Sequence, residues 1–176
     1  MPNYFLDTSA LAKRYHKESG SEYLDRILEQ QGSQSLISHL SIVELESVLA
    51  IKRRTGEIDQ QALEIARRRF RADLARQRLI VAPPVRESHF HSARKLLIQY
   101  GVAEGLRTLD ALQLAIALDL RELGHVGGAC CGRPKTLPGR LVGRLFDGES
   151  RAARSSAGLS TSAAASAPRK HRPFCG

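Results

Sequence analysis

The amino-acid sequence predicts an α/β fold with three layers, in which a parallel sheet lies between helices. Short strand-like runs and longer amphipathic stretches alternate through residues 3–125, a pattern typical of chains whose strands are connected by helices. The helical stretches carry apolar stripes, such as Leu63, Ala66 and Phe70, so each can bury one face. From Gly127 onward no such pattern persists.

Glycines and prolines mark the ends of several elements. Gly56 and Gly101 are typical helix stops, and Pro83 with Pro84 cannot continue a strand ladder. In chain order, the sequence predicts a strand at 3–6, helices at 10–15 and 21–30, a strand at 35–38, helices at 40–53 and about 59–75, a strand at 79–81, and helices at 89–100 and 108–123.

The segment after His125 has a different composition. It is rich in Gly, Ala, Ser and Pro, and cannot bury enough apolar surface to offset its ordering entropy. A strand is expected soon after the last helix, but none is visible, so the domain is predicted to lack its last strand or strands. Either a flexible basic tail or a shifted reading frame would explain this. We therefore expect a domain at 1–125 and a low-complexity, disordered or frameshifted tail at 126–176.

The net charge of +9 is concentrated in that last segment. Residues 127–176 hold nine Lys and Arg against two Asp and Glu, whereas residues 1–126 hold 18 against 16. The nearly neutral body does not by itself indicate a polyanionic partner. The basic run Arg67-Arg68-Arg69 is interpreted as a solvated helix face, with RNA contact as the alternative. The adjacent Cys130-Cys131 has neither zinc-ligand nor redox spacing.

The sequence shows no signal for a membrane. No apolar run approaches the ~20 residues that span a bilayer, and the N-terminus lacks a basic-then-apolar signal sequence. We therefore expect a cytoplasmic protein with no membrane association.

Three acids lie at positions from which their side chains could share one site. Asp7 follows the first strand, Glu44 lies in a helical stretch, and Asp110 opens the last helix. Each also has a structural interpretation. Asp7 fits a helix N-cap, and Glu44 fits a capping box with Ser41. Asp110 would place a favourable negative charge in the first helical turn.

The helical positions favour a site shared by these acids. Glu44 falls between Val48 and Ile51 on a mostly apolar surface. Asp110 shares its ridge with Leu114. An inward acid is costly unless it is paired, protonated or bound to a cation. A carboxylate cluster without His or Cys suits Mg²⁺ or Mn²⁺, which can activate water and neutralise charge on a phosphodiester.

The residues around these acids resemble the leading motifs of PIN-domain ribonucleases, most closely those of the VapC toxins of bacterial toxin–antitoxin pairs. The order, spacing and flanking residues of the motifs agree over roughly residues 1–125. The matching segments are Tyr-Phe-Leu-Asp-Thr-Ser-Ala-Leu at 4–11, Ser-Ile-Val-Glu-Leu at 41–45 and Arg-Thr-Leu-Asp-Ala-Leu-Gln-Leu-Ala at 107–115.

The resemblance implies a PIN-like domain with metal-dependent endoribonuclease activity. It implies that Asp7, Glu44 and Asp110 bind Mg²⁺ or Mn²⁺ and position the attacking water. Thr8 or Ser9 would help to hold the first acid or a phosphate. It further implies an RNA substrate, a cognate antitoxin protein and a homodimer.

The sequence departs from the family pattern after the last helix. Where the family has a strand and a fourth Asp, this chain reads Gly-Gly-Ala-Cys-Cys-Gly at 127–132. Asp147 is expected to be a turn residue. Loss of the strand would uncover the edge of the first strand, which is an aggregation hazard. The alternative function is therefore a catalytically impaired remnant that only binds an antitoxin or its own twin subunit.

Overall fold

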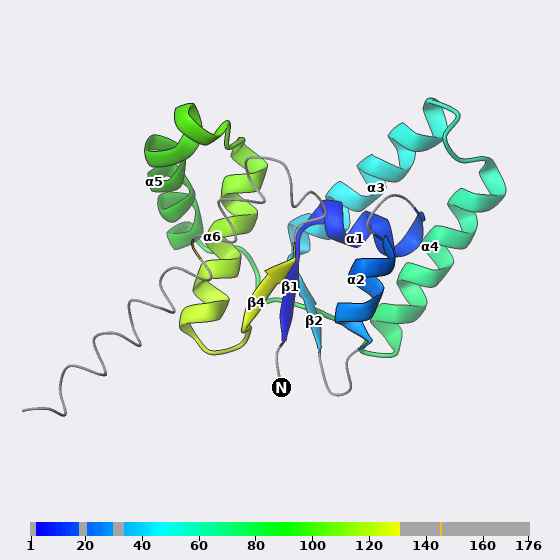
Figure 1. Cartoon of the computed structure of the whole chain (residues 1–176), viewed down its shortest axis with the longest axis horizontal. Helices are drawn as coiled ribbons and strands as arrows, with labels where there is room; N and C mark the ends of the chain where they lie inside the picture. Colours follow the sequence, from blue (N-terminus) through cyan, green and yellow to red (C-terminus); the bar gives the residue numbers. More distant parts are fainter. Residues whose placement is uncertain (1–2, 18–20, 30–33, 131–144, 146–176) are drawn as a thin grey trace, which may run out of the picture.

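The computed structural model describes residues 3–17, 21–29, 34–130 and 145 of the chain. Strands and helices alternate as predicted (Figure 1). In order, the elements are β1 (Tyr4–Leu6), α1 (Thr8–Tyr15), α2 (Ser21–Leu28), β2 (Ser35–Ile37), α3 (His39–Arg54), α4 (Gln60–Ala75), β3 (Leu79–Val81), α5 (Glu87–Glu104), α6 (Thr108–Glu122) and β4 (Gly128–Cys130).

The strands form one parallel sheet with the order β3-β2-β1-β4. Tyr4 of β1 is in register with Ser35 of β2 on one side and with Gly128 of β4 on the other. The strand order therefore reverses at β1, because β2 and β3 lie to one side of it and β4 lies to the other. In open α/β sheets, the carboxyl ends of the strands at such a point are where ligands bind.

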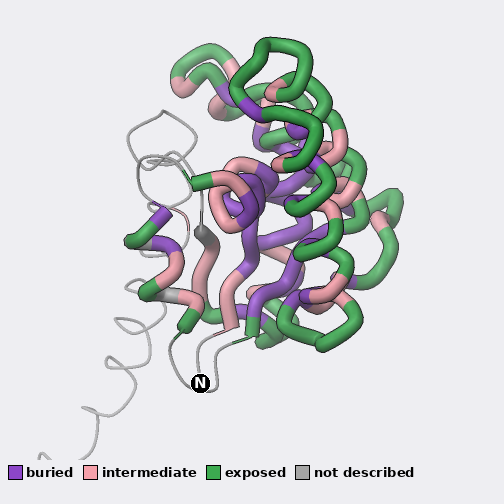
Figure 2. Tube along the Cα trace, turned by 90° about the vertical axis from the view of Figure 1, so that its right-hand side faces the viewer, coloured by how far each residue is buried: buried purple, intermediate pink, exposed green. Residues whose placement is uncertain are grey.

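The sheet separates two hydrophobic cores, which confirms the predicted three-layer fold. Phe5 and Leu36 pack with α5 and α6, whereas Leu6 and Ile37 pack with α1 to α4. Adjacent residues of a strand point to opposite faces, so each of these strands contributes to both cores. Figure 2 shows the buried residues along the strands and the inner sides of the helices.

The C-terminal end of α5 differs from the prediction. The helix continues through Gly101 to Glu104, and the cap is Gly105, with φ of 61°. A left-handed residue at this position is what usually ends a helix, and glycine adopts it without strain. The predicted stop at Gly101 is therefore wrong, whereas Gly56 does have a left-handed φ of 79° just after α3.

The prediction that no strand follows the last helix is wrong. Residues 128–130 form β4, which pairs in parallel with β1 and covers its edge. The segment is also tied to the first strand by Gly127 N donating to Asn3 O at 2.9 Å and Asn3 Nδ2 donating to His125 O at 3.0 Å. The sheet therefore extends beyond the expected domain boundary at residue 125.

The remainder of the predicted tail, including Asp147, lies outside the described residues apart from Leu145. The Leu145 side chain packs against the core of α5 and α6, and its carbonyl accepts a hydrogen bond from Arg121 Nη1 at 2.7 Å. None of the helices in the described ranges combines the length with the apolar character that a bilayer crossing requires.

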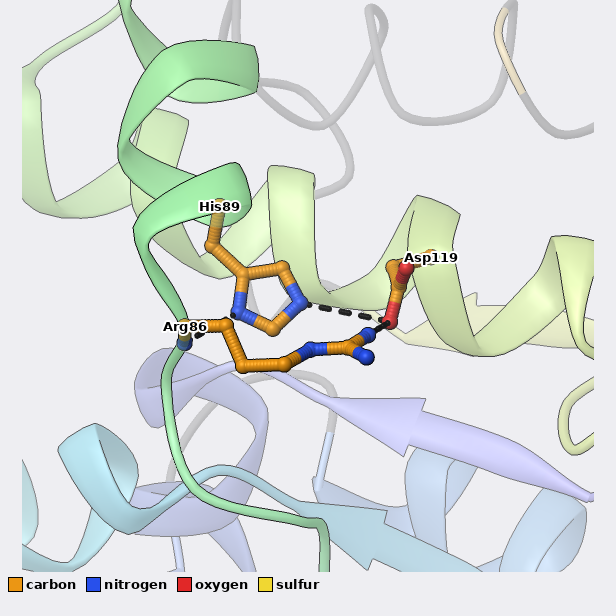
Figure 3. A network of polar contacts seen from close by, with 3 residues as sticks. All are labelled: Arg86, His89 and Asp119. Carbon is orange, nitrogen blue, oxygen red and sulfur yellow. Dashed lines mark hydrogen bonds and ion pairs between the residues drawn. The ribbon is translucent and has the colours of Figure 1, made fainter.

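A buried histidine joins α5 to α6 (Figure 3). His89 is 4% exposed, and its Nδ1 accepts a hydrogen bond from the Arg86 backbone N–H at 3.0 Å. Its Nε2 lies 3.2 Å from Asp119 Oδ2, which also accepts from Arg86 Nη2 at 2.6 Å. Because Nδ1 accepts, the ring proton is placed on Nε2 and donates to Asp119. This histidine therefore stabilises the packing of two helices.

Candidate functional site

Asp7 lies directly after β1, at the point where the strand order reverses. It is the N-cap of α1, and its Oδ1 accepts a hydrogen bond from Ala10 N at 2.7 Å. The N-cap interpretation is therefore confirmed. A carboxylate has about four acceptor positions, so the cap is compatible with a second role. The Asp7 side chain is half-buried.

Glu44 connects the second motif to the first and third. The side chain is half-buried in α3, and its Oε2 accepts hydrogen bonds from Thr8 Oγ1 at 2.6 Å and Gln113 Nε2 at 2.7 Å. Thr8 immediately follows Asp7, and Gln113 follows Asp110 by one helical turn. Segments more than thirty residues apart in the chain are therefore joined at this carboxylate.

The capping-box interpretation of Ser41 and Glu44 is wrong. The N-cap of α3 is Ser38, and Ser41 is the third residue of the helix and completes the box. Helix α3 starts directly after β2, because Ser38 is the first residue beyond the buried strand and keeps an extended backbone. The Glu44 side chain is therefore not used for capping.

Gln113 is the site residue that sequence reasoning missed. It is 5% exposed, and its Nε2 contacts Thr8 Oγ1 at 3.3 Å and Ser41 Oγ at 3.0 Å in addition to Glu44. Its Oε1 accepts a hydrogen bond from Ser38 Oγ at 2.8 Å. The available signal was a single amide within a helical run that is otherwise apolar. A buried polar group requires such partners.

Asp110 lies in the first turn of α6 and is exposed, whereas the residues from 111 to 117 are buried. The expected inward orientation of Asp110 is wrong, because its turn precedes the part of α6 that enters the core. It still lies three residues before Gln113, and residues at this spacing share a helix face. Ser9 is a half-buried residue of α1, next to Thr8.

The chemistry of these donors fits a hard divalent cation. The three acids offer only carboxylate oxygens, which Mg²⁺ and Mn²⁺ prefer. Glu44 Oε2 is engaged by Thr8 and Gln113, so Oε1 is the atom that this side chain would offer. The structure does not, however, gather Asp7, Glu44 and Asp110 into one metal-binding group, because within the described residues no three His, Cys, Asp or Glu side chains form a group that could hold a metal ion.

Comparison with known proteins assigns the fold to a family. The PIN domain family matches residues 4–122, a range that runs from β1 to the end of α6 and contains Asp7, Glu44 and Asp110. No curated protein matches the chain. PIN domains are generally metal-dependent nucleases. On the length of this match and on its parallel α/β sheet, the chain belongs to the PIN domain family.

Proposed function

We propose that this protein is a metal-dependent endoribonuclease of the VapC type, the toxin component of a toxin–antitoxin pair. The observation that carries the proposal is the Glu44 carboxylate, which is hydrogen-bonded to Thr8 and Gln113. Through these contacts the segments that carry Asp7 and Asp110 meet at the carboxyl end of the sheet, where a phosphodiester would bind.

Asp7, Glu44 and Asp110 would hold Mg²⁺ or Mn²⁺. When bound, the ion would supply an activated water and neutralise charge on the phosphate. Thr8 and Gln113 keep the Glu44 side chain oriented, because both donate hydrogen bonds to its Oε2. The α1 N-terminus keeps Asp7 in place, and the neighbouring Ser9 hydroxyl would be a donor for a phosphate oxygen.

The partners in this proposal are RNA, a cognate antitoxin that covers the acids, and a second copy of the chain. A surface on α5 supports the homodimer. Ile98 and Val102 are exposed by 70% and 101%, and they lie one helical turn apart on the same side of α5. Exposed apolar side chains that lie together mark protein contacts.

The test is RNA cleavage with Mg²⁺ by the full chain and by Asp7→Asn. Asp59→Asn is a matched control, because Asp59 caps α4 as Asp7 caps α1, with the same 2.7 Å bond to the third residue of its helix. Asn also caps helices, so neither substitution should unfold the protein. We expect EDTA-sensitive cleavage that Asp7→Asn abolishes and Asp59→Asn retains.

Equal cleavage by the two variants would exclude Asp7 from the chemistry. A parent chain that folds, binds an antitoxin and does not cleave RNA would instead support the alternative of a catalytically impaired remnant. That alternative rests on residues 123–130, the segment after α6, which contain no Asp or Glu.

A further inference from the structure

A polar pocket lies between α1, α2 and the C-terminal end of α4, and Asp7, Glu44 and Asp110 are not among the residues that line it. Its volume is about 340 Å³. Among the described residues that line it, the cations outnumber the acids by six to three. This local excess is larger than the net charge of the whole body, which is nearly neutral. The cations are Lys13, Arg14, Lys17, Arg69, Arg76 and Arg78.

The floor of this α1–α2–α4 pocket is fixed by Asp73, which is 8% exposed. Its Oδ2 accepts hydrogen bonds from Arg14 Nε and Tyr15 Oη, each at 3.0 Å. Its Oδ1 lies 3.6 Å from Arg78 Nη1. One buried carboxylate therefore holds two guanidinium groups in place.

Three other cations at the rim have no such counterion. Lys17, Arg69 and Arg76 are exposed and have no ion pair within the described ranges. Arg69 lies on α4 and Arg76 is the C-cap residue directly after it, seven residues further on, so the two lie on the same side of this helix end. Asp25 and Glu29 also line the pocket, but the cations remain in excess, and an excess of like charges around one pocket attracts an anion. The arginines of the basic run at 67–69 therefore have different environments. Arg67 forms an ion pair with Glu46 at 2.7 Å, whereas Arg69 lines the pocket.

The lining favours phosphates over an acidic protein. Protein interfaces contain an apolar or aromatic core, but Tyr15 and Ala72 are the less polar side chains here, and Tyr15 is buried against Phe70 with ring centroids 5.6 Å apart. Arginine and lysine side chains around a polar hollow suit the oxygens of a phosphate backbone. The pocket therefore has an excess of positive charge but no exposed apolar surface on which a peptide side chain could pack.

Helix α1 connects this pocket to the site of the proposed reaction. Asp7 precedes the helix and Arg14 lies in its last turn, so at about 1.5 Å per residue they are separated by roughly 10 Å along the axis. A nucleic-acid strand advances by about 3.4 Å per nucleotide in a duplex. A strand that follows α1 would thus reach the pocket within a few nucleotides.

We propose that the α1–α2–α4 pocket binds backbone phosphates of an RNA strand, a few nucleotides from the bond at the carboxylates. This inference rests on the proposed function. Phosphate contacts position a strand without reading its sequence. The pocket would therefore contribute affinity and register, and leave the choice of target to other contacts.

The test is binding of a fluorescent single-stranded RNA of about 15 nucleotides, a length within the usual site sizes, to the full chain in EDTA. The pocket variant combines Lys17→Gln, Arg69→Gln and Arg76→Gln. The control variant removes the same charge elsewhere and combines Arg53→Gln, Arg54→Gln and Arg68→Gln, which are exposed residues without an ion pair in the described chain.

We expect the plot of log affinity against log salt to become shallower by about 2 in the pocket variant, since each neutralised phosphate of a single strand contributes about 0.7. The control variant should keep the slope of the parent. Equal slopes in all three proteins, equal losses in the two variants, or no RNA binding by the parent would each overturn the proposal. So would pocket-dependent binding of oligoglutamate in place of RNA, which would assign the pocket to an acidic polypeptide.

Failure of this inference is distinguishable from failure of the proposed function. Binding is measured without a metal, so it does not depend on cleavage. Cleavage by the parent with unchanged binding by the pocket variant overturns the pocket alone. Pocket-dependent binding without cleavage overturns the nuclease proposal alone.

Discussion

Gln113 on α6 donates a 2.7 Å hydrogen bond to Glu44 on α3. These helices lie on opposite faces of the sheet, so one buried amide links the two outer layers of the fold. The same amide contacts the hydroxyls of Thr8 and Ser38, which lie just beyond the ends of β1 and β2, and the hydroxyl of Ser41 in the first turn of α3. The network is therefore part of both the site and the packing.

This network predicts a large cost for Gln113→Leu. Leucine suits the apolar surroundings of α6, but the Glu44 carboxylate and the Ser38 hydroxyl would each lose one hydrogen-bond partner. A buried group that loses its partner costs about 1–3 kcal/mol, so urea denaturation should show a decrease of that size in the free energy of unfolding. Gln99→Leu on the exposed side of α5 should change it by less than about 0.5 kcal/mol. Similar effects of the two substitutions would contradict the network.

A second prediction separates metal binding from helix stability at Glu44. Because Ser38 and Ser41 cap α3, Glu44→Gln should leave the helix intact. It should remove most of the rise in Tm that Mn²⁺ gives the parent, since a ligand that binds only the native state stabilises it. Glu46→Gln, on the same helix and paired with Arg67, should retain the Mn²⁺ response. Thermal unfolding with and without Mn²⁺ is the measurement, and an undiminished response in Glu44→Gln would exclude this ligand.

The buried contact between Tyr15 and Asp73 predicts a loss of stability in alkali. Burial raises the pKa of the Tyr15 phenol well above its usual range, and the Asp73 charge acts in the same direction. The native state therefore keeps this proton at a pH where the unfolded chain loses it. The stabilisation is complete below the unfolded pKa of about 10 and declines as the pH rises beyond it.

We therefore expect the free energy of unfolding to fall from about pH 10 upward. Urea denaturation across that range should show a smaller fall in Tyr15→Phe, which lacks the titrating group. The variant is also expected to be less stable at neutral pH, because Asp73 loses a donor at 3.0 Å. Parallel pH profiles for the parent and Tyr15→Phe would refute the assignment.

A fourth prediction concerns β4. A Cβ atom at Gly128 would lie 3.2 Å from two ring atoms of Tyr4, closer than an ordinary contact. Gly128→Val should therefore lower the free energy of unfolding by about 1–3 kcal/mol, as overpacking does. Tyr4→Ala removes the ring, so the double variant should lose less than the sum of the two single changes. Strict additivity, measured by chemical denaturation, would show that the two residues are not in contact.

Most of the fold could be predicted from the spacing of apolar residues and from the glycines and prolines that end helices and strands. The strand at 79–81 has the predicted bounds, and the helices from α1 to α6 lie within a few residues of the expected ranges. These elements bury an apolar stripe or run, which is visible in the residues themselves. The acids were also assigned to the right elements, because the strand and helix patterns around them are visible in the sequence.

The strand β4 and the site network could not be predicted in this way. Gly-Ala-Cys has little apolar side chain to reveal a strand, and its place in the sheet follows from backbone pairing with β1. A larger residue at position 128 would moreover press against the Tyr4 ring, a contact that the sequence does not reveal. The orientation of Gln113 depends on residues that are distant in sequence, so no local pattern indicates it.

The pairing of the first strand with the last one has a consequence for synthesis on the ribosome. Tyr4 is in register with Gly128, so β1 acquires this neighbour only after 124 further residues have been added. At roughly 5–20 residues per second, the delay is on the order of 10 s. During that time the nascent chain exposes an apolar strand edge directly before Asp7, and long-range parallel pairing of this kind is slow to form. A translational pause before residue 128 would therefore lengthen the period in which the incomplete sheet can associate with other chains.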